Sequence, residues 1–402
     1  MEKQEKGVCM PLGYLAAGMW AGFKKSKKKD LALVFSVVQA TCCGVYTTNK
    51  VKGAPLQVTQ ENLSDGRAQA IIINSGNANT CTENGYEVAR KTCSILASGL
   101  GIEEKDVVVA STGIIGVPLS IKPFEKNMAS LIKGLSEEGN FQAASAILTT
   151  DRKTKEASST IETPHGEIRI GAMAKGSGMI NPNMATMLSF FTTDADITLE
   201  LLKEALFETV ETTFNQISID GDTSTNDMVI IMANGESCVK IRNRDDVYQE
   251  FKQGLLKLSR KLCKMIARDG EGATKQITCK VLKAASLDQA RLLSKSVISS
   301  NLVKAAMFGK DANWGRILCA LGYGKTEALL DDVSIVFKSE KGEVKVCENS
   351  KNFPFPETLA KEILSSQDVE IRVTLNEGEF EAEAYGCDLT YEYVRINGDY
   401  RT

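Results

Sequence analysis

The amino-acid sequence predicts an α/β fold on three observations. Segments 31–38, 68–74 and 106–111 are rich in β-branched residues and are bounded by turn-forming residues, which is typical of buried strands. Between the last two, segment 84–98 places its apolar residues on one helical face and is followed by glycines that end the helix. This order of strand, helix and strand is the repeating unit of layered α/β folds.

The same alternation continues through the second half of the chain. Its periodicity predicts strands at 188–193, 228–233 and 277–284, and helices at 199–214, 247–267 and 286–299. Short alternating strands follow between residues 332 and 386. We therefore expect a larger α/β core over residues 1–282 and a smaller C-terminal α/β domain over residues 283–402.

The composition of the chain excludes several classes of partner. Its 402 residues include 43% hydrophobic and 25% charged residues, and the net charge is only −3. A balance so close to neutral gives no electrostatic basis for binding nucleic acid or an anionic membrane. No stretch approaches the roughly 18 apolar residues of a membrane span, and residues 1–6 contain no apolar signal segment. We expect a cytoplasmic protein.

The eleven cysteines are scattered and include no Cys-x-x-Cys pair. This pattern predicts neither a disulfide framework nor a zinc site, and it fits small buried side chains in a reducing compartment.

A glycine-rich, polar segment, 175–184, leads into Ala185 and Thr186 and then into an apolar run. A threonine hydroxyl is a weak nucleophile, but a threonine at a chain terminus can use its own α-amine as the base. That arrangement requires the bond before the threonine to break, and glycines allow the tight bend that such a reaction needs. The segment therefore predicts self-cleavage between Ala185 and Thr186, giving fragments 1–185 and 186–402.

The histidine content supports this interpretation. The single histidine, His165, lies in a Pro-His-Gly sequence that is typical of a turn. No histidine then remains for a Ser-His-Asp triad or a multi-histidine metal site. An α-amine, with a pKa of ~7.7–8.0, is a suitable base near neutral pH.

Two nucleotide- or metal-binding motifs are incomplete. Gly324-Lys325-Thr326 resembles the end of a phosphate loop. However, Cys319 occupies the position, five residues before Gly324, where that loop requires a glycine. The loop 220–227 resembles a calcium loop, but Thr225 and Ile231 replace its glycine and its final glutamate. Five polar loops remain, and we expect several of them to converge: 74–79, 111–113, 175–183, 220–227 and 269–275.

The segment 175–180 followed by 182–188 resembles the signature of the glutamate N-acetyltransferase (ornithine acetyltransferase) family of arginine biosynthesis. Matches in the same order extend over nearly the whole chain, which makes the resemblance more specific than any single motif. They include 74–79, 111–113, 148–151, 220–227, 268–275, 311–316 and 393–402.

The resemblance implies a self-processed enzyme that acetylates glutamate with N-acetylornithine as donor, releasing ornithine. The acetyl group would pass through an ester on Thr186, and some members of the family also accept acetyl-CoA. It implies an α/β sandwich of the N-terminal-nucleophile type, shared with self-cleaving aminopeptidases, and a dimer of cleaved α/β pairs. No metal or prosthetic group is expected.

The resemblance also implies roles for individual residues. The Thr112 hydroxyl and the Gly113 N–H would stabilise the oxyanion. Lys175 would bind the substrate α-carboxylate, and Glu271 would pair with the ornithine ammonium. Hydrogen bonds to substrate would come from Thr149, Asn397 and Thr402.

Two alternatives remain open at this point. A self-processing aminopeptidase or amidase of the same architecture would pass the acyl group to water, and a serine in place of Thr186 would favour it. A non-catalytic binding protein would not cleave itself at all.

Overall fold

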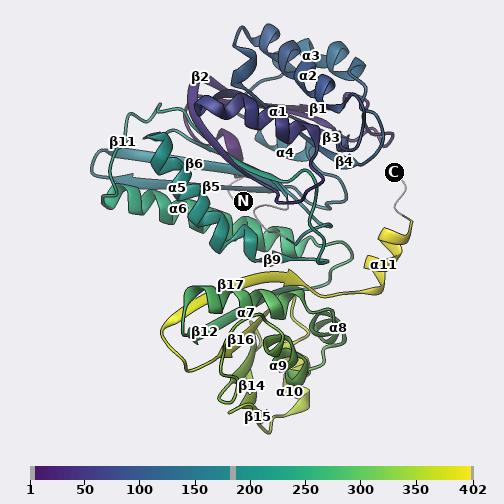
Figure 1. The fold of residues 1–402 in the computed structure, drawn as a ribbon, viewed down its shortest axis with the longest axis vertical. Helices are drawn as coiled ribbons and strands as arrows, with labels where there is room; N and C mark the ends of the chain where they lie inside the picture. Colours follow the sequence, from purple (N-terminus) through teal and green to yellow (C-terminus); the bar gives the residue numbers. More distant parts are fainter. Residues whose placement is uncertain (1–4, 182–186, 400–402) are drawn as a thin grey trace.

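The computed structural model describes residues 5–181 and 187–399, which form two lobes stacked along the long axis of the molecule (Figure 1). The larger lobe contains the sheet formed by the first ten strands other than β8 and β9. The smaller lobe contains the C-terminal sheet and its own buried core.

Among the described residues, the larger lobe is built on an eight-stranded sheet with strand order β4-β3-β2-β10-β7-β6-β5, and β1 pairs with β2 beside this path. The strands are β1 (Tyr14–Met19), β2 (Leu31–Tyr46), β3 (Arg67–Asn77), β4 (Val107–Ile114), β5 (Lys155–Thr163), β6 (Gly166–Lys175), β7 (Leu188–Thr193) and β10 (Met228–Ala233). A separate pair is formed by β8 (Asp196–Ile197) and β11 (Lys240–Ile241).

The long strand β2 joins two halves of the larger sheet. Residues 31–35 and 40–41 pair with β3, residues 41–46 pair with β10, and the exposed residues 37–39 interrupt the pairing with β3. Side chains from both halves belong to one buried cluster, including Val34, Ile73, Phe190 and Ile230. The two halves therefore face each other across a shared apolar core, as the layers of a sandwich do.

Helices cover the two outer faces of this sandwich (Figure 1). On the β2-β3-β4 half, the helices α2 (Gly85–Leu100) and α3 (Lys122–Lys133) bury their apolar sides. On the other half, α5 (Leu199–Thr212) and α6 (Asp246–Arg268) do the same. Two shorter helices, α1 (Ala54–Asn62) and α4 (Asn140–Ala146), pack against β4 and β1. These layers confirm the expected α/β sandwich.

The smaller lobe is a second α/β unit, with strand order β15-β14-β13-β16-β12-β17-β9 among the described residues. Its strands are β9 (Ile217–Ser218), β12 (Gln276–Ala284), β13 (Ser334–Ser339), β14 (Gly342–Glu348), β15 (Lys351–Asn352), β16 (Asp368–Thr374) and β17 (Phe380–Cys387). Its helices are α7 (Leu287–Ser299), α8 (Asn301–Gly309), α9 (Trp314–Gly322) and α10 (Glu357–Ile363). The boundary expected after residue 282 falls inside β12.

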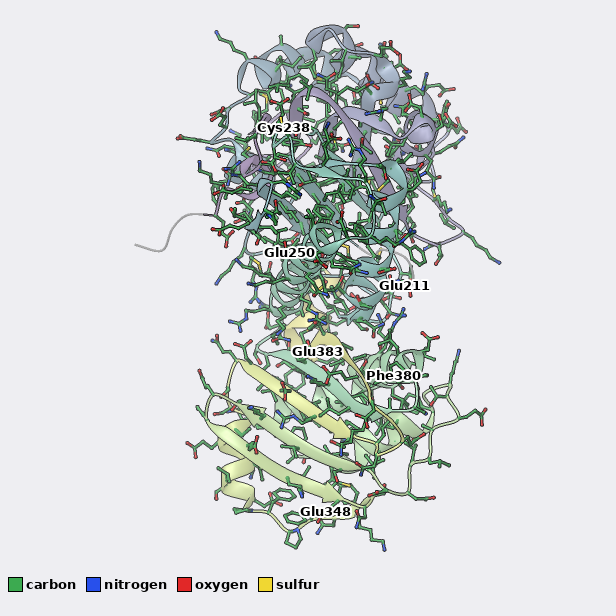
Figure 2. All side chains as sticks on the ribbon, turned by 90° about the vertical axis from the view of Figure 1, so that its left-hand side faces the viewer. Glu211, Cys238, Glu250, Glu348, Phe380 and Glu383 are labelled. Atoms are coloured by element: carbon green, nitrogen blue, oxygen red, sulfur yellow. The ribbon has the colours of Figure 1, made fainter. Side chains whose placement is uncertain are left out.

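Several contacts join the lobes. The short strand β9 comes from the middle of the chain but pairs in parallel with β17, so the smaller sheet includes a strand from outside its own segment. Arg291 of α7 forms an ion pair with Glu211 of α5, and Figure 2 shows Glu211 at the edge of the larger lobe that faces the smaller one. The last helix, α11 (Tyr391–Gly398), follows β17 and is set apart from both sheets, at the side of the molecule (Figure 1).

In the described part of the chain, no helix has both the length and the apolar character needed to cross a membrane.

Candidate active site

All five polar loops singled out in the sequence contribute to one cavity of about 140 Å³. They supply Ala78, Thr112, Lys175, Asp227 and Glu271 to its wall. Larger surface grooves of about 890 and 810 Å³ lie elsewhere, but none of the described residues that are predicted to act on substrate lines either of them. The small cavity is therefore the candidate active site.

Every predicted site residue that the structure describes lines this cavity: Thr112, Gly113, Thr149, Lys175, Glu271 and Asn397. Ala185, Thr186 and Thr402 lie outside the described residues. On the two sides of the segment 182–186, Ile180 and Leu188 are both in the cavity wall. The chain thus meets the cavity immediately before and after the predicted cleavage segment.

The backbone around Gly113 accepts only glycine. Gly113 lies near the end of β4 with φ of +134°, a conformation that L side chains rarely adopt. A Cβ atom there would lie 2.4 Å from the carbonyl carbon of Gly76 on the neighbouring strand β3. The missing side chain therefore lets the two strand ends approach closely and brings the Gly113 backbone to the cavity wall.

Lys175 ends β6 and is 9% exposed. Its Nζ donates to Thr112 Oγ1 at 3.3 Å, across the cavity from β6 to β4. The positive charge is therefore fixed beside the predicted oxyanion donor, where it can attract the carboxylate of a substrate.

A buried ion network fixes three of the loops around the cavity. Asp151 Oδ1 accepts from Lys155 Nζ at 2.6 Å and from the Gly176 backbone N–H at 2.7 Å. Lys155 Nζ also donates to Asp269 Oδ2 at 2.7 Å. Burial alone would raise the pKa of Asp151, but the charges of Lys155 and Lys175 outweigh it and hold that pKa below its ordinary value. Asp151 is therefore an ionised anchor of the site.

Glu271 connects the cavity to the C-terminal helix. It is 9% exposed, and its Oε2 accepts a hydrogen bond from Asn397 Nδ2 of α11 at 2.8 Å. A Cβ atom at Gly178 would lie 2.4 Å from the same oxygen, so the glycine leaves room for the carboxylate. Asp388 holds the loop by accepting from the Thr274 N–H at 2.8 Å. A carboxylate on a fixed loop is a suitable partner for a substrate ammonium.

One segment, 219–228, holds the chain on both sides of the predicted cleavage site. Asp220 accepts from the backbone N–H groups of Met179 and Ile180, at 2.6 and 2.9 Å. On the other side, the Met228 N–H donates to the Met187 carbonyl at 3.0 Å. The polar character of this loop is visible in the sequence, but this role is not, because both contacts depend on the three-dimensional fold.

Within the described residues, no group of three or more histidine, cysteine, aspartate or glutamate side chains could hold a metal ion.

Comparisons with known proteins identify the family of this chain. The ArgJ family model matches residues 15–402, nearly the whole chain. The chain belongs to the ArgJ family. The arginine biosynthesis bifunctional protein ArgJ of Caldanaerobacter subterraneus is 48% identical to this ArgJ-family chain over 404 residues and covers 100% of both proteins. The ArgJ 1 protein of Clostridium acetobutylicum is 46% identical over 97% of this chain and 96% of its own length.

The crystal structure of an arginine biosynthesis bifunctional protein ArgJ from Bacillus halodurans is 42% identical, with a TM-score of 0.51. The match covers 100% of that solved chain but 54% of this ArgJ-family chain. The family expected from the sequence is thereby confirmed.

Proposed function

We propose that this ArgJ-family enzyme moves an acetyl group from N-acetylornithine to glutamate, with Thr186 as the nucleophile. The observation that carries the proposal is the joint position of Thr112, Gly113, Lys175 and Glu271 in one small cavity. A cavity of about 140 Å³ is smaller than the ~300–1,000 Å³ typical of drug-sized ligands, which suits a single modified amino acid.

The first half-reaction places the donor between the two charges of the cavity. Its α-carboxylate binds Lys175 and its side-chain ammonium binds Glu271. The Thr186 hydroxyl, deprotonated by its own α-amine, attacks the acetyl carbonyl carbon. Negative charge then develops on the carbonyl oxygen, and the Thr112 hydroxyl and the Gly113 N–H stabilise it. The C–N bond breaks, ornithine leaves, and the acetyl group remains on Thr186 as an ester.

In the second half-reaction, glutamate enters the same cavity and its α-amine attacks the ester. The C–O bond to Thr186 breaks, the hydroxyl regains a proton, and N-acetylglutamate leaves. Because one nucleophile serves two substrates in turn, the kinetics are ping-pong. Thr149, Asn397 and Thr402 complete the substrate contacts by hydrogen bonds.

Thr186 becomes an N-terminus by self-cleavage after Ala185. Its hydroxyl attacks the Ala185 carbonyl carbon, the peptide becomes an ester, and water hydrolyses that ester. The contacts of segment 219–228 with residues 179, 180 and 187 support this step, because they hold both sides of the breaking bond. A fragment from Thr186 to Thr402 would be 217 of the 402 residues, or 54% of this chain, and the match to the solved relative covers the same share of this chain and 100% of that one.

An assay of purified protein with N-acetylornithine and glutamate tests the proposal. We expect N-acetylglutamate and ornithine in equal amounts, and no free acetate. Free acetate without N-acetylglutamate would instead identify the aminopeptidase or amidase activity, because water would be the acceptor. The same assay with acetyl-CoA as donor tests a second acetyl source.

We also propose that the reaction needs no metal or prosthetic group and that the cleaved chains assemble as a dimer of α/β pairs in the cytoplasm. All eleven cysteines are free, which supports a reducing compartment. An activity assay in the presence of a chelator tests whether a metal is needed. The mass of the native assembly tests the dimer of α/β pairs.

A further inference from the structure

One carboxyl group in the cavity has no role in the reaction as described. Asp227 immediately precedes β10 and lines the cavity. Its side chain is buried, and among the described residues its Oδ2 atom has no hydrogen-bond partner. A buried carboxylate oxygen without a partner is costly. Its position in the wall of the candidate cavity places this carboxyl group beside the site of the proposed reaction.

The surroundings of Asp227 allow it to change its protonation state. Among the described lining residues, the charged ones are Lys175 on β6, Asp227 itself and Glu271. Glu271 is already engaged with Asn397. Burial raises the pKa of Asp227 well above its ordinary value, against the opposing charge of Lys175 and a hydrogen bond from Ser224. When a substrate carboxylate neutralises Lys175, the protonated form of Asp227 is favoured further.

The two half-reactions differ in their proton balance, so a group in the site must bind a proton in one and release it in the other. An amide nitrogen that leaves as ornithine ammonium takes the proton of the Thr186 hydroxyl and one more. Glutamate arrives as an ammonium and must lose one proton before it can attack the ester. The first half-reaction therefore consumes a proton and the second releases one.

Resting on the proposed function, we propose that Asp227 is a further catalytic residue that carries this proton between the two half-reactions. Protonated Asp227 gives its proton to the departing ornithine amine as the C–N bond breaks, and is left as a carboxylate. That carboxylate takes a proton from the incoming glutamate ammonium. The amine then attacks the ester, its remaining extra proton returns to the Thr186 oxygen, and Asp227 is protonated for the next cycle.

The half-reactions can be tested separately by rapid quenching and mass spectrometry of the fragment that begins at Thr186. Acetylation by N-acetylornithine requires protonated Asp227, so its rate should fall on the alkaline side. Deacetylation by glutamate requires the carboxylate, so its rate should rise over the same pH range. Asp227→Asn keeps the size of the side chain but cannot exchange the proton. We expect it to slow both half-reactions by ~10²-fold or more and to leave KM nearly unchanged. It should also abolish both limbs of the pH profile, which are the alkaline fall in the acetylation rate and the rise in the deacetylation rate.

Two further variants complete the test. Asp331→Asn removes an exposed carboxylate from the smaller lobe, outside the cavity wall, and should behave as wild type. Asp227→Glu retains an exchangeable proton and should keep both limbs with a shifted midpoint, which also covers the case in which Asp227→Asn does not fold or cleave. Wild-type rates in Asp227→Asn, or slow rates with both limbs retained, would overturn the inference. Absence of the acetylated fragment in wild type would instead overturn the proposed function.

Discussion

Lys175 Nζ donates a hydrogen bond to Thr112 Oγ1 at 3.3 Å, and this contact joins the ends of β6 and β4 from opposite halves of the sandwich. A lysine ammonium only donates, so it occupies a lone pair of the threonine oxygen and leaves the hydroxyl hydrogen free. That hydrogen is the group that an oxyanion requires. The contact therefore orients Thr112 for catalysis as well as holding Lys175.

Removing the Thr112 hydroxyl tests this arrangement. We expect Thr112→Ala to lower kcat by ~10²–10³-fold, the usual loss for one oxyanion donor. Self-cleavage should also slow, because it passes through a similar tetrahedral oxyanion. Thr112→Ser retains the hydroxyl and is the matched control, so it should keep most of the activity. An unchanged kcat in Thr112→Ala would place the oxyanion site elsewhere.

Self-cleavage predicts two fragments, of 185 and 217 residues, on a denaturing gel. N-terminal sequencing of the larger fragment should begin at Thr186. We expect Thr186→Ala to remain one intact and inactive chain, since cleavage and acetyl transfer use the same hydroxyl. Thr186→Ser keeps a hydroxyl and should still cleave. Active wild-type protein with Met1 as its sole N-terminus would contradict the prediction.

The Glu271 carboxylate should matter more for ornithine-containing substrates than for glutamate. Glu271→Gln can still accept the bond from Asn397 but loses the charge that pairs with the ornithine ammonium. A hydrogen bond to a charged group contributes ~1.5–3 kcal/mol, so we expect KM for N-acetylornithine to rise about 10- to 100-fold. Glu392→Gln, on the exposed start of α11, is the control. An equal rise in KM for both substrates would argue against this pairing.

Long amphipathic elements were predictable from the sequence because periodicity specifies them directly. The helix expected at 247–267 is α6 (Asp246–Arg268), and the strand expected at 277–284 is β12 (Gln276–Ala284). The strand expected at 31–38 is instead β2 (Leu31–Tyr46), since its exposed middle breaks the apolar pattern. The nine-residue helices α8 and α9 were not expected, because short apolar runs do not distinguish a helix from a strand.

The candidate site could be predicted from the sequence only through its motifs. Glycine-rich and polar loops were visible, and the family resemblance assigned roles to particular residues in them. The Lys155–Asp269 contact, by contrast, joins residues 114 positions apart in the chain. No local pattern reveals such a pair, because tertiary packing alone creates it.

The buried network around Lys155 should be important for stability. Lys155 is 1% exposed and bridges Asp151 and Asp269. Lys155→Met would leave both carboxylates without their buried cation, so we expect a loss of ~3–5 kcal/mol in the free energy of unfolding. Denaturant titration measures it, and Lys153→Met, at an exposed neighbouring position, is the control. A loss no larger than that of the control would contradict the prediction.

The same network predicts sensitivity to acid. The pKa of Asp151 is lowered in the folded protein, so the folded state binds its proton less readily than the unfolded state does. The stabilisation by Asp151 is therefore complete above the ordinary carboxyl pKa of ~3.9 and is lost as the pH falls through the lowered folded value. The difference in unfolding free energy between wild type and Asp151→Asn should therefore become smaller as the pH falls.

Lys304, at the junction of the two lobes, predicts a second pH dependence of stability, in a more alkaline range. Its Nζ donates to the carbonyls of Ser218 on β9 and Cys387 on β17, at 3.0 and 2.9 Å, and burial lowers its pKa. Between that lowered value and the ~10.4 of an unfolded lysine, the unfolded chain binds a proton that the folded protein lacks. Stability should therefore rise with pH in this window, by at most about 1.4 kcal/mol per pH unit.

Lys304→Met isolates this contribution, because methionine cannot titrate. We expect the wild type to gain stability over Lys304→Met as the pH rises from neutral toward 10.4, measured by denaturant titration at each pH. Lys325→Met removes an exposed lysine from the same lobe and should follow the wild type at every pH. Parallel curves for wild type and Lys304→Met would show that the pKa of Lys304 is the same in the folded and unfolded states. In that case burial at the lobe junction would impose no cost on its charge.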